Sequence, residues 1–234
     1  MVRSQDPVTR ELDVDFVLHG VGGSAPSGPA AAWAARAVPG DRVMLLGPAL
    51  SANRSVAFRP PSDATRIVLA ADATALPAVG GILEALPAGT RVRAWVEIPD
   101  VGDIQAIETA AEAEIEWRVR QPGRRPGDAV IDAIRAAETA ETAAENAAEA
   151  ALDDLPDLPD LLDLPDLPDL PDLPDLPYVR IAGESGLVKT LRRHFVRDRG
   201  LDRTRVAFTG YWRLGVSEDQ IRTDQLRTGQ LRTE

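Results

Sequence analysis

The sequence of 234 residues contains no cysteine and only two histidines, His19 and His194. Without cysteine the chain cannot form disulfide bridges, thiolate-ligated zinc sites, iron–sulfur clusters or a thiol nucleophile. Two histidines cannot complete a three-histidine metal site within one chain, and histidine-dependent catalysis would have to use one of them. We therefore expect neither a cysteine-ligated nor a three-histidine metal site.

An excess of positive charge is also missing, because the net charge is −11. Residues 153–177 contain nine aspartates and residues 138–150 contain four glutamates, with no basic residue in either segment. These thirteen carboxylates account for the whole deficit and leave the rest of the chain slightly positive. Nucleic-acid binding requires a basic surface, so we expect no nucleic-acid partner.

The sequence has no apolar run of about 18 residues, the minimum for a membrane-spanning helix. The first residues lack the apolar core of a secretory signal peptide. We therefore expect a cytoplasmic protein, and a monomer.

Apolar segments that alternate with helical patterns predict an α/β fold with a mostly parallel sheet. In the first part of the chain we expect strands at 12–18 and 42–46, a helix at 29–37 and a linker at 47–63. In the second part the predicted strands are 66–71, 91–98, 115–119, 178–182 and 206–209. The predicted helices between them are 74–86, 103–113, 128–150 and 184–199.

Two segments are tandem repeats. From Leu155 to Pro177 the triplet Leu-Pro-Asp recurs, and a proline at every third position excludes a helix and disfavours a central strand. We expect the triplets to be extended, and to form the end of a low-complexity insertion over 138–177. From Arg222 the tail repeats with a period of five, and 216–234 is expected to be a disordered tail. An alternative role for the triplets is to dock in an aromatic groove.

Two glycine-rich motifs invite functional interpretations that their contexts do not favour. The string Gly20-Val-Gly-Gly-Ser-Ala fits a dinucleotide fingerprint, but Pro26 interrupts the helix that must follow, which favours a plain loop. The string Gly183-Glu-Ser-Gly is similar to a nucleophile elbow, but Leu187 stands where its final glycine belongs. We interpret the second motif as a close strand-to-helix turn.

A basic cluster follows this turn, and two interpretations stay open for it. One is a solvated helix face; the other is an anion site for a cofactor phosphate, because a helix start with small residues precedes it. The cluster consists of Lys189, Arg192, Arg193, Arg197, Arg199, Arg203 and Arg205.

Two other positions favour nucleotide binding more strongly. The string Gly28-Pro-Ala-Ala-Ala-Trp33 starts a helix after a glycine loop, where free backbone N–H groups favour a phosphate. The string Ala70-Ala-Asp-Ala-Thr-Ala-Leu-Pro77 joins a strand to a helix through tiny residues. In open α/β sheets nucleotides bind at such carboxyl ends of strands.

Several longer strings together resemble the siderophore-interacting proteins. They are Thr9-Arg-Glu-Leu-Asp-Val-Asp-Phe-Val-Leu-His-Gly20, Gly28-Pro-Ala with Trp33-Ala, Pro39-Gly-Asp-Arg42, Gly183-Glu-Ser-Gly followed by Val188-Lys and Leu191-Arg-Arg-His194, and Thr209-Gly-Tyr-Trp-Arg213. The resemblance covers about residues 2–215, without the repeats. It implies a ferredoxin-reductase-like protein with a flavin-binding β-barrel over 1–62 and an α/β nicotinamide-binding domain over 63–215.

The resemblance implies NAD(P)H- and FAD-dependent reduction of ferric siderophores, in which cofactors rather than side chains do the chemistry. At the flavin it places Arg3, His19, Gly28, Pro29, Ala30, Trp33, Tyr211 and Trp212. At the nicotinamide nucleotide it places Asp72, Thr74, Ala75, Pro77, Gly183, Glu184 and Ser185. Glu97 ends the second α/β strand, where a carboxylate would favour NADH over NADPH, whereas the basic cluster would favour the phosphate of NADPH.

The chain departs from the family pattern at two positions. The flavin signature Arg-x-Tyr-Thr-x-Arg would lie ahead of Met1, with Val2-Arg3 as its end, so we expect an N-terminally truncated, partial flavin barrel. The usual Gly-Asp-Glu-Thr is Ala71-Asp-Ala-Thr74 here. The alternative to a reductase is therefore a non-enzymatic remnant or interaction protein without a working flavin site.

Overall fold

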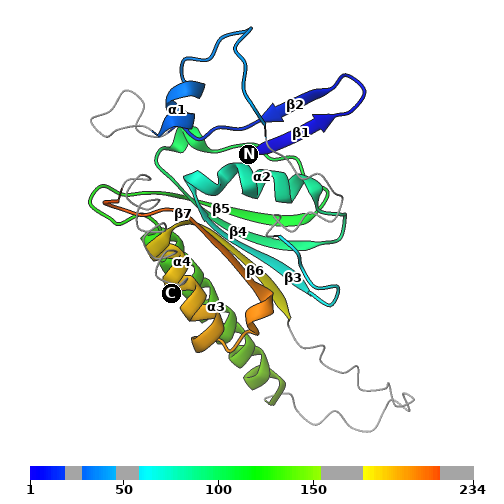
Figure 1. The fold of residues 1–234 in the computed structure, drawn as a ribbon. Helices are drawn as coiled ribbons and strands as arrows, with labels where there is room; N and C mark the ends of the chain where they lie inside the picture. Colours follow the sequence, from blue (N-terminus) through cyan, green and yellow to red (C-terminus); the bar gives the residue numbers. More distant parts are fainter. Residues whose placement is uncertain (19–27, 46–57, 154–175, 217–234) are drawn as a thin grey trace, which may run out of the picture.

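The computed structural model describes residues 1–18, 28–45, 58–153 and 176–216. Its centre is a sheet of five parallel strands in the order β5-β4-β3-β6-β7 (Figure 1). The strands are β3 (Arg66–Asp72), β4 (Arg91–Ile98), β5 (Glu112–Val119), β6 (Pro177–Glu184) and β7 (Val206–Trp212). The predicted α/β class with a mostly parallel sheet is confirmed.

Helices cover both faces of this sheet. Helix α2 (Leu76–Ala85) lies on one face, while α3 (Asp128–Asp153) and α4 (Ser185–Arg193) lie on the other (Figure 1). A π-helical turn at His194–Asp198 continues α4. Strands buried on both faces read as continuous apolar runs, which explains why β3 has almost no polar residue before its end.

The side chains on the two faces of β3 pack into two separate apolar cores. Ile67, Leu69 and Ala71 pack with α2 and with Tyr178 of β6. Val68 and Ala70 pack with apolar residues of α3 and α4. Burial on both sides fixes the position of β3 in the centre of the sheet, so its carboxyl end is held firmly in place.

The N-terminal segment lies on the α2 side of the sheet (Figure 1). It contains an antiparallel pair, β1 (Val2–Asp6) and β2 (Glu11–Val14), and the short helix α1 (Pro29–Ala34). Arg3 of β1 joins the segment to α2, because its guanidinium pairs with Asp15 at 3.3 Å and with Glu84 of α2 at 2.5 Å. The guanidinium occupies the space that a Cβ at Gly80 would need, so this contact requires glycine there.

Several predicted elements of the first part were wrong or too long. The strand predicted at 12–18 is only Glu11–Val14, and the helix predicted at 29–37 ends at Ala34. Residues 42–45 form no strand, and the apolar side chains among them are exposed rather than covered by a described neighbour. The strand β1 was not predicted, because the polar sequence Val2-Arg-Ser-Gln-Asp6 has no apolar alternation.

The helix predicted at 103–113 was also wrong. A short 3-10 turn at Val101–Asp103 is followed by an irregular segment and then by β5. Thr109 fixes the irregular segment by donating to the Leu83 carbonyl at 2.5 Å, and Ile107 packs on the α2-side core. These tertiary contacts outweigh the helical propensity of the alanines and glutamates.

The structure describes only the first part of the expected low-complexity insertion at 138–177. Residues 138–153 belong to α3 (Asp128–Asp153), as the helix predicted at 128–150 requires. The triplet repeats at 154–175, residues 47–57 of the predicted linker and the tail at 217–234 lie outside the described residues. Among the helices that are described, none has the length and apolar character needed to cross a membrane.

Candidate functional site at the carboxyl ends of the strands

Asp72, the last residue of β3, joins three strand ends at the carboxyl edge of the sheet. Its Oδ1 accepts hydrogen bonds from the backbone N–H of Thr74 at 2.9 Å and from the Thr74 hydroxyl at 2.5 Å. Its Oδ2 accepts from the backbone N–H of Glu184 at 2.7 Å and from the indole N–H of Trp212 at 2.9 Å. The carboxylate is 4% exposed, so these four donors replace its water shell.

Gly183 allows Asp72 to come this close to β6. Its φ of +141° lies in a region that L side chains rarely adopt, and a Cβ built there would stand 2.6 Å from Asp72 Oδ2. The glycine of the Gly183-Glu-Ser-Gly motif is therefore needed for the close approach of a carboxylate. This confirms the prediction of a close strand-to-helix turn.

Glu184 caps the N-terminus of α4 with its own side chain. Its Oε2 accepts from the backbone N–H groups of Gly186 and Leu187, the second at 3.2 Å, and its Oε1 accepts from the N–H of Leu214 at 3.2 Å. The carboxylate is 6% exposed. It lies where the helix dipole and the free N–H groups favour an anion.

Ser185 completes the connection to the end of β7. Its hydroxyl donates to the Trp212 carbonyl at 2.8 Å. His194, at the far end of α4, instead lies 2.7 Å from Glu138. Ser185 and His194 therefore do not form a nucleophile–base pair, and His19 lies outside the described residues.

Glu97 ends β4 beside Asp72 in the sheet register. It is 2% exposed, and both of its carboxylate oxygens accept from the backbone N–H of Gly127 at 3.0 Å, just ahead of α3. Burial raises the pKa of Glu97 above its ordinary value, partly offset by the Gly127 and Ala129 backbone hydrogen bonds. The proposed ribose contact of this carboxylate was wrong, because the carboxylate is buried and already used by the fold.

The remaining residues predicted at the nicotinamide nucleotide differ in accessibility. Thr74 and Pro77 are half-buried at the start of the α2 segment. Ala75 is fully buried in the core beneath α2, so its predicted contact with a cofactor was wrong. Two of the residues predicted at the flavin, Tyr211 and Trp212, lie near these residues at the end of β7, where Tyr211 is 41% exposed and Trp212 is half-buried.

The other residues predicted at the flavin belong to the N-terminal part of the chain. Gly28 is the N-cap residue of α1, Pro29 and Ala30 begin the helix, and the Trp33 ring packs against Phe16 with centroids 5.6 Å apart. Arg3 is held by its two ion pairs with Asp15 and Glu84. His19 lies outside the described residues.

The predicted basic cluster is not one anion site. Arg192 stacks on the Phe208 ring at 4.4 Å, Arg205 pairs with Asp63 at 2.5 Å, and Arg199 lies 3.6 Å from Glu138. These three side chains use separate partners. The solvated-face interpretation therefore describes the cluster better than a shared phosphate site.

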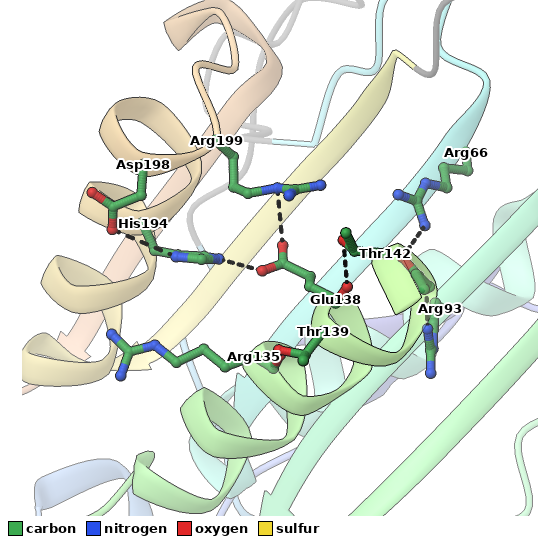
Figure 2. A network of polar contacts seen from close by, with 10 residues as sticks. Arg66, Arg93, Arg135, Glu138, Thr139, Thr142, His194, Asp198 and Arg199 are labelled. Atoms are coloured by element: carbon green, nitrogen blue, oxygen red, sulfur yellow. Dashed lines mark hydrogen bonds and ion pairs between the residues drawn. The ribbon is translucent and has the colours of Figure 1, made fainter. Parts of the chain in front are cut away.

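A polar network that the sequence did not indicate lies at the other end of the sheet, between α3 and α4. Figure 2 shows Glu138 between His194 and Arg199, and Glu141 of α3 pairs with Arg93 at 2.5 Å and with Arg66 at 3.9 Å. A cavity of about 270 Å³ adjoins this network and is also lined by Trp95 and Phe195. It lies at the amino ends of β3 and β6, away from the Asp72 edge.

Two further contacts of the Asp72 edge were missed by sequence reasoning. Gly127 has a φ of +89°, and the turn Pro126-Gly-Asp before a helical pattern was a visible signal for it. Leu214 contributes only its backbone N–H, for which no sequence signal exists. Among the described residues no group of three metal-ligating side chains occurs, so the edge offers backbone turns, carboxylates and the Trp212 ring.

Comparisons with known proteins agree with this architecture. The sequence model of the siderophore-interacting protein family matches residues 64–215, and that of the siderophore-interacting FAD-binding domain matches residues 1–52. The family resemblance read from the sequence is thereby confirmed.

An uncharacterized protein of Mycobacterium tuberculosis is 32% identical over 231 residues, which cover 94% of this chain and 66% of that protein. The ferric vibriobactin reductase ViuB of Vibrio cholerae is 32% identical over 123 residues, 53% of this chain and 41% of ViuB. A siderophore utilization protein from T. fusca has a similar structure, with a TM-score of 0.58 and 32% identity over 92% of this chain and 66% of the other. The chain thus spans just under two thirds of the length of its mycobacterial relative.

Proposed function

Because the chain belongs to the siderophore-interacting protein family, we propose that it takes part in the flavin-dependent reduction of ferric siderophores. One observation supports this most directly. The residues that the resemblance assigned on three separate strand ends, Asp72, Glu184 and Trp212, are joined by direct hydrogen bonds at one edge. The printed activity of ViuB, a ferric vibriobactin reductase, supports the same class of reaction.

The start of α1 fits a flavin phosphate. Gly28 has no side chain that could cap the helix, and Pro29 and Ala30 leave the first turn uncrowded. We propose that Gly28, Pro29 and Ala30 hold the phosphates of FAD and that the Trp33–Phe16 pair supports the helix from behind. Bound flavin would accept a hydride equivalent and pass single electrons to ferric iron.

In this proposal, Asp72, Gly183 and Trp212 form a fixed surface at the strand ends, next to the bound flavin. The hydrogen bond from the Trp212 indole to Asp72 fixes the position of Trp212. In this proposal the buried carboxylates of the edge neither donate nor accept a proton. We propose NADH or NADPH as the electron donor. The ferric siderophore is the substrate and brings its own iron.

Flavin binding tests the proposal directly. FAD is titrated into the purified chain, and the quenching of flavin fluorescence is followed. The protein is then photoreduced without oxygen and mixed with a ferric siderophore, and released Fe(II) is trapped by a coloured chelator. We expect saturable FAD binding and siderophore-dependent Fe(II) release.

Matched variants locate the flavin site. Ala30→Asp places a carboxylate at the start of α1 and is expected to weaken FAD binding at least tenfold. Ala35→Asp places the same charge just after the helix, at the end away from the phosphate, and is expected to leave binding within twofold. Absence of FAD binding and of Fe(II) release by the unaltered chain would instead favour the non-enzymatic interaction protein.

A further inference from the structure

At the described carboxyl edge, buried carboxylates of the chain accept backbone N–H groups at the starts of α4, α3 and the 3-10 turn Ala73–Ala75, whereas α2 itself has no side-chain cap. Glu184 accepts from the first turn of α4, Glu97 accepts from Gly127 at the start of α3, and Asp72 accepts from Thr74 ahead of α2. The exposed fractions of these side chains are 6%, 2% and 4%. At the N-terminus of α4, the N–H groups that could bind a phosphate in an open α/β sheet are therefore used within the fold.

At the N-terminus of α4, three backbone N–H groups donate to buried carboxylates of the chain. The N–H groups of Gly186 and Leu187 both point to Glu184 Oε2, and the N–H of Glu184 itself points to Asp72 Oδ2. A phosphate at this place would have to displace the carboxylate or lie in contact with it. Either alternative is unfavourable, because like charges repel strongly where water is excluded.

A nicotinamide dinucleotide that binds by its diphosphate at α4 therefore does not fit the residues present. The reduced nicotinamide ring carries no charge and meets no such repulsion. We propose that Glu184 is a specificity-determining residue, which excludes the diphosphate of an electron donor from the N-terminus of α4. The identity of the ligand as an electron donor rests on the proposed function; the exclusion of a diphosphate does not.

Neutral replacements of Glu184 test the exclusion without removing the helix cap. Glu184→Gln keeps an oxygen acceptor for the helix N–H groups and removes the charge. Glu184→Ser is a second neutral cap with a shorter side chain, in case the glutamine amide does not fit beside the N–H of Leu214. Glu112→Gln is the matched control, because Glu112 is an exposed glutamate at the amino edge of the sheet.

Inorganic pyrophosphate is the probe, and calorimetric titration gives its dissociation constant. We expect the unaltered chain and Glu112→Gln to bind pyrophosphate weakly and equally, and at least one of the two Glu184 variants to bind it at least tenfold more tightly. Thermal melting establishes that each variant is folded. NADH, titrated in parallel, is expected to gain affinity in the same Glu184 variant, whereas nicotinamide riboside in its reduced form gains none.

Equal pyrophosphate affinity in the unaltered chain and in both folded Glu184 variants, including no binding by any of them, would overturn the proposal. A gain in affinity for reduced nicotinamide riboside as large as the gain for NADH would also overturn the proposal. The riboside has no phosphate, so the effect of Glu184 could not then be exclusion of a diphosphate. None of these measurements uses FAD or iron. A failure of the proposed reductase function therefore leaves their outcome unaffected.

Discussion

The indole N–H of Trp212 lies 2.9 Å from the Asp72 carboxylate, although the two residues are 140 positions apart in the chain. This contact ties the end of β7 to the end of β3 across β6, which runs between them in the sheet. Since Asp72 also accepts from Glu184 and Thr74, a single buried carboxylate organises the whole candidate site. Its removal should therefore have a larger effect than the loss of one hydrogen bond.

Asp72→Ala is expected to lower the free energy of unfolding by about 3 kcal/mol, because several buried donors lose their acceptor at once. Urea unfolding followed by circular dichroism measures this loss. Asp132→Ala is the control, since Asp132 is exposed and forms a surface ion pair with Arg124, worth less than about 1 kcal/mol. Similar losses in the two variants would mean that Asp72 does not organise the edge.

Gly183→Ala should destabilise the chain because the new methyl group would collide with Asp72 and the φ of +141° disfavours any L side chain. We expect a loss of about 2–3 kcal/mol in the free energy of unfolding. Gly89→Ala provides the comparison. Gly89 also has a positive φ, but no atom lies within 4 Å of the position that its new Cβ would take. Chemical denaturation of both variants should show a smaller loss, about 1 kcal/mol, for Gly89→Ala.

The sequence sufficed to predict the parallel sheet because its three inner strands, β4, β3 and β6, are buried on both faces. Strand β4 was predicted with its observed bounds, Arg91–Ile98, since its apolar run ends at a turn on either side. The Gly183 turn was likewise visible, because small residues between a strand and a helix indicate close packing. These features depend on neighbouring residues alone.

The sequence did not suffice where distant partners decide the structure. The segment around Thr109 has helical propensity, but its hydrogen bond to the Leu83 carbonyl holds it in an irregular conformation. Asp72, Glu97 and Glu184 were recognised as residues of a strand edge, yet their partners are backbone N–H groups that carry no residue-specific signal. A carboxylate that caps a helix and one that binds a ligand look alike in a sequence.

The stability contributed by Glu97 should depend on pH. Its folded-state pKa is raised above the ordinary value of 4.5, so the folded chain binds this proton more tightly than the unfolded chain. The stabilisation is fully present below about pH 4.5 and is lost as pH rises through the raised pKa. Glu97→Gln, which has no proton to lose, should therefore gain melting temperature relative to the unaltered chain between pH 4 and pH 7.

Melting curves at half-unit pH intervals would follow this difference. The exposed Glu112→Gln variant should keep a constant offset from the unaltered chain over the same range. A constant offset for Glu97→Gln as well would show that burial does not shift the proton equilibrium of Glu97.

Arg180 of β6 is expected to cost stability rather than supply it. The residue is 7% exposed, its Nη2 donates to the Thr209 hydroxyl at 2.9 Å, and within the described part of the chain its Nη1 has no hydrogen-bond partner. Taking a guanidinium out of water without a carboxylate to neutralise it is unfavourable, and an apolar side chain of similar length avoids that cost. Arg180→Met should therefore raise the free energy of unfolding, by about 1 kcal/mol, in urea titrations at neutral pH.

Arg192→Met is the control, because Arg192 is exposed and stacks on Phe208, a contact whose loss should lower stability slightly. A loss of more than about 1 kcal/mol in Arg180→Met would show that the buried cation contributes net stabilisation, and the argument from desolvation would be wrong.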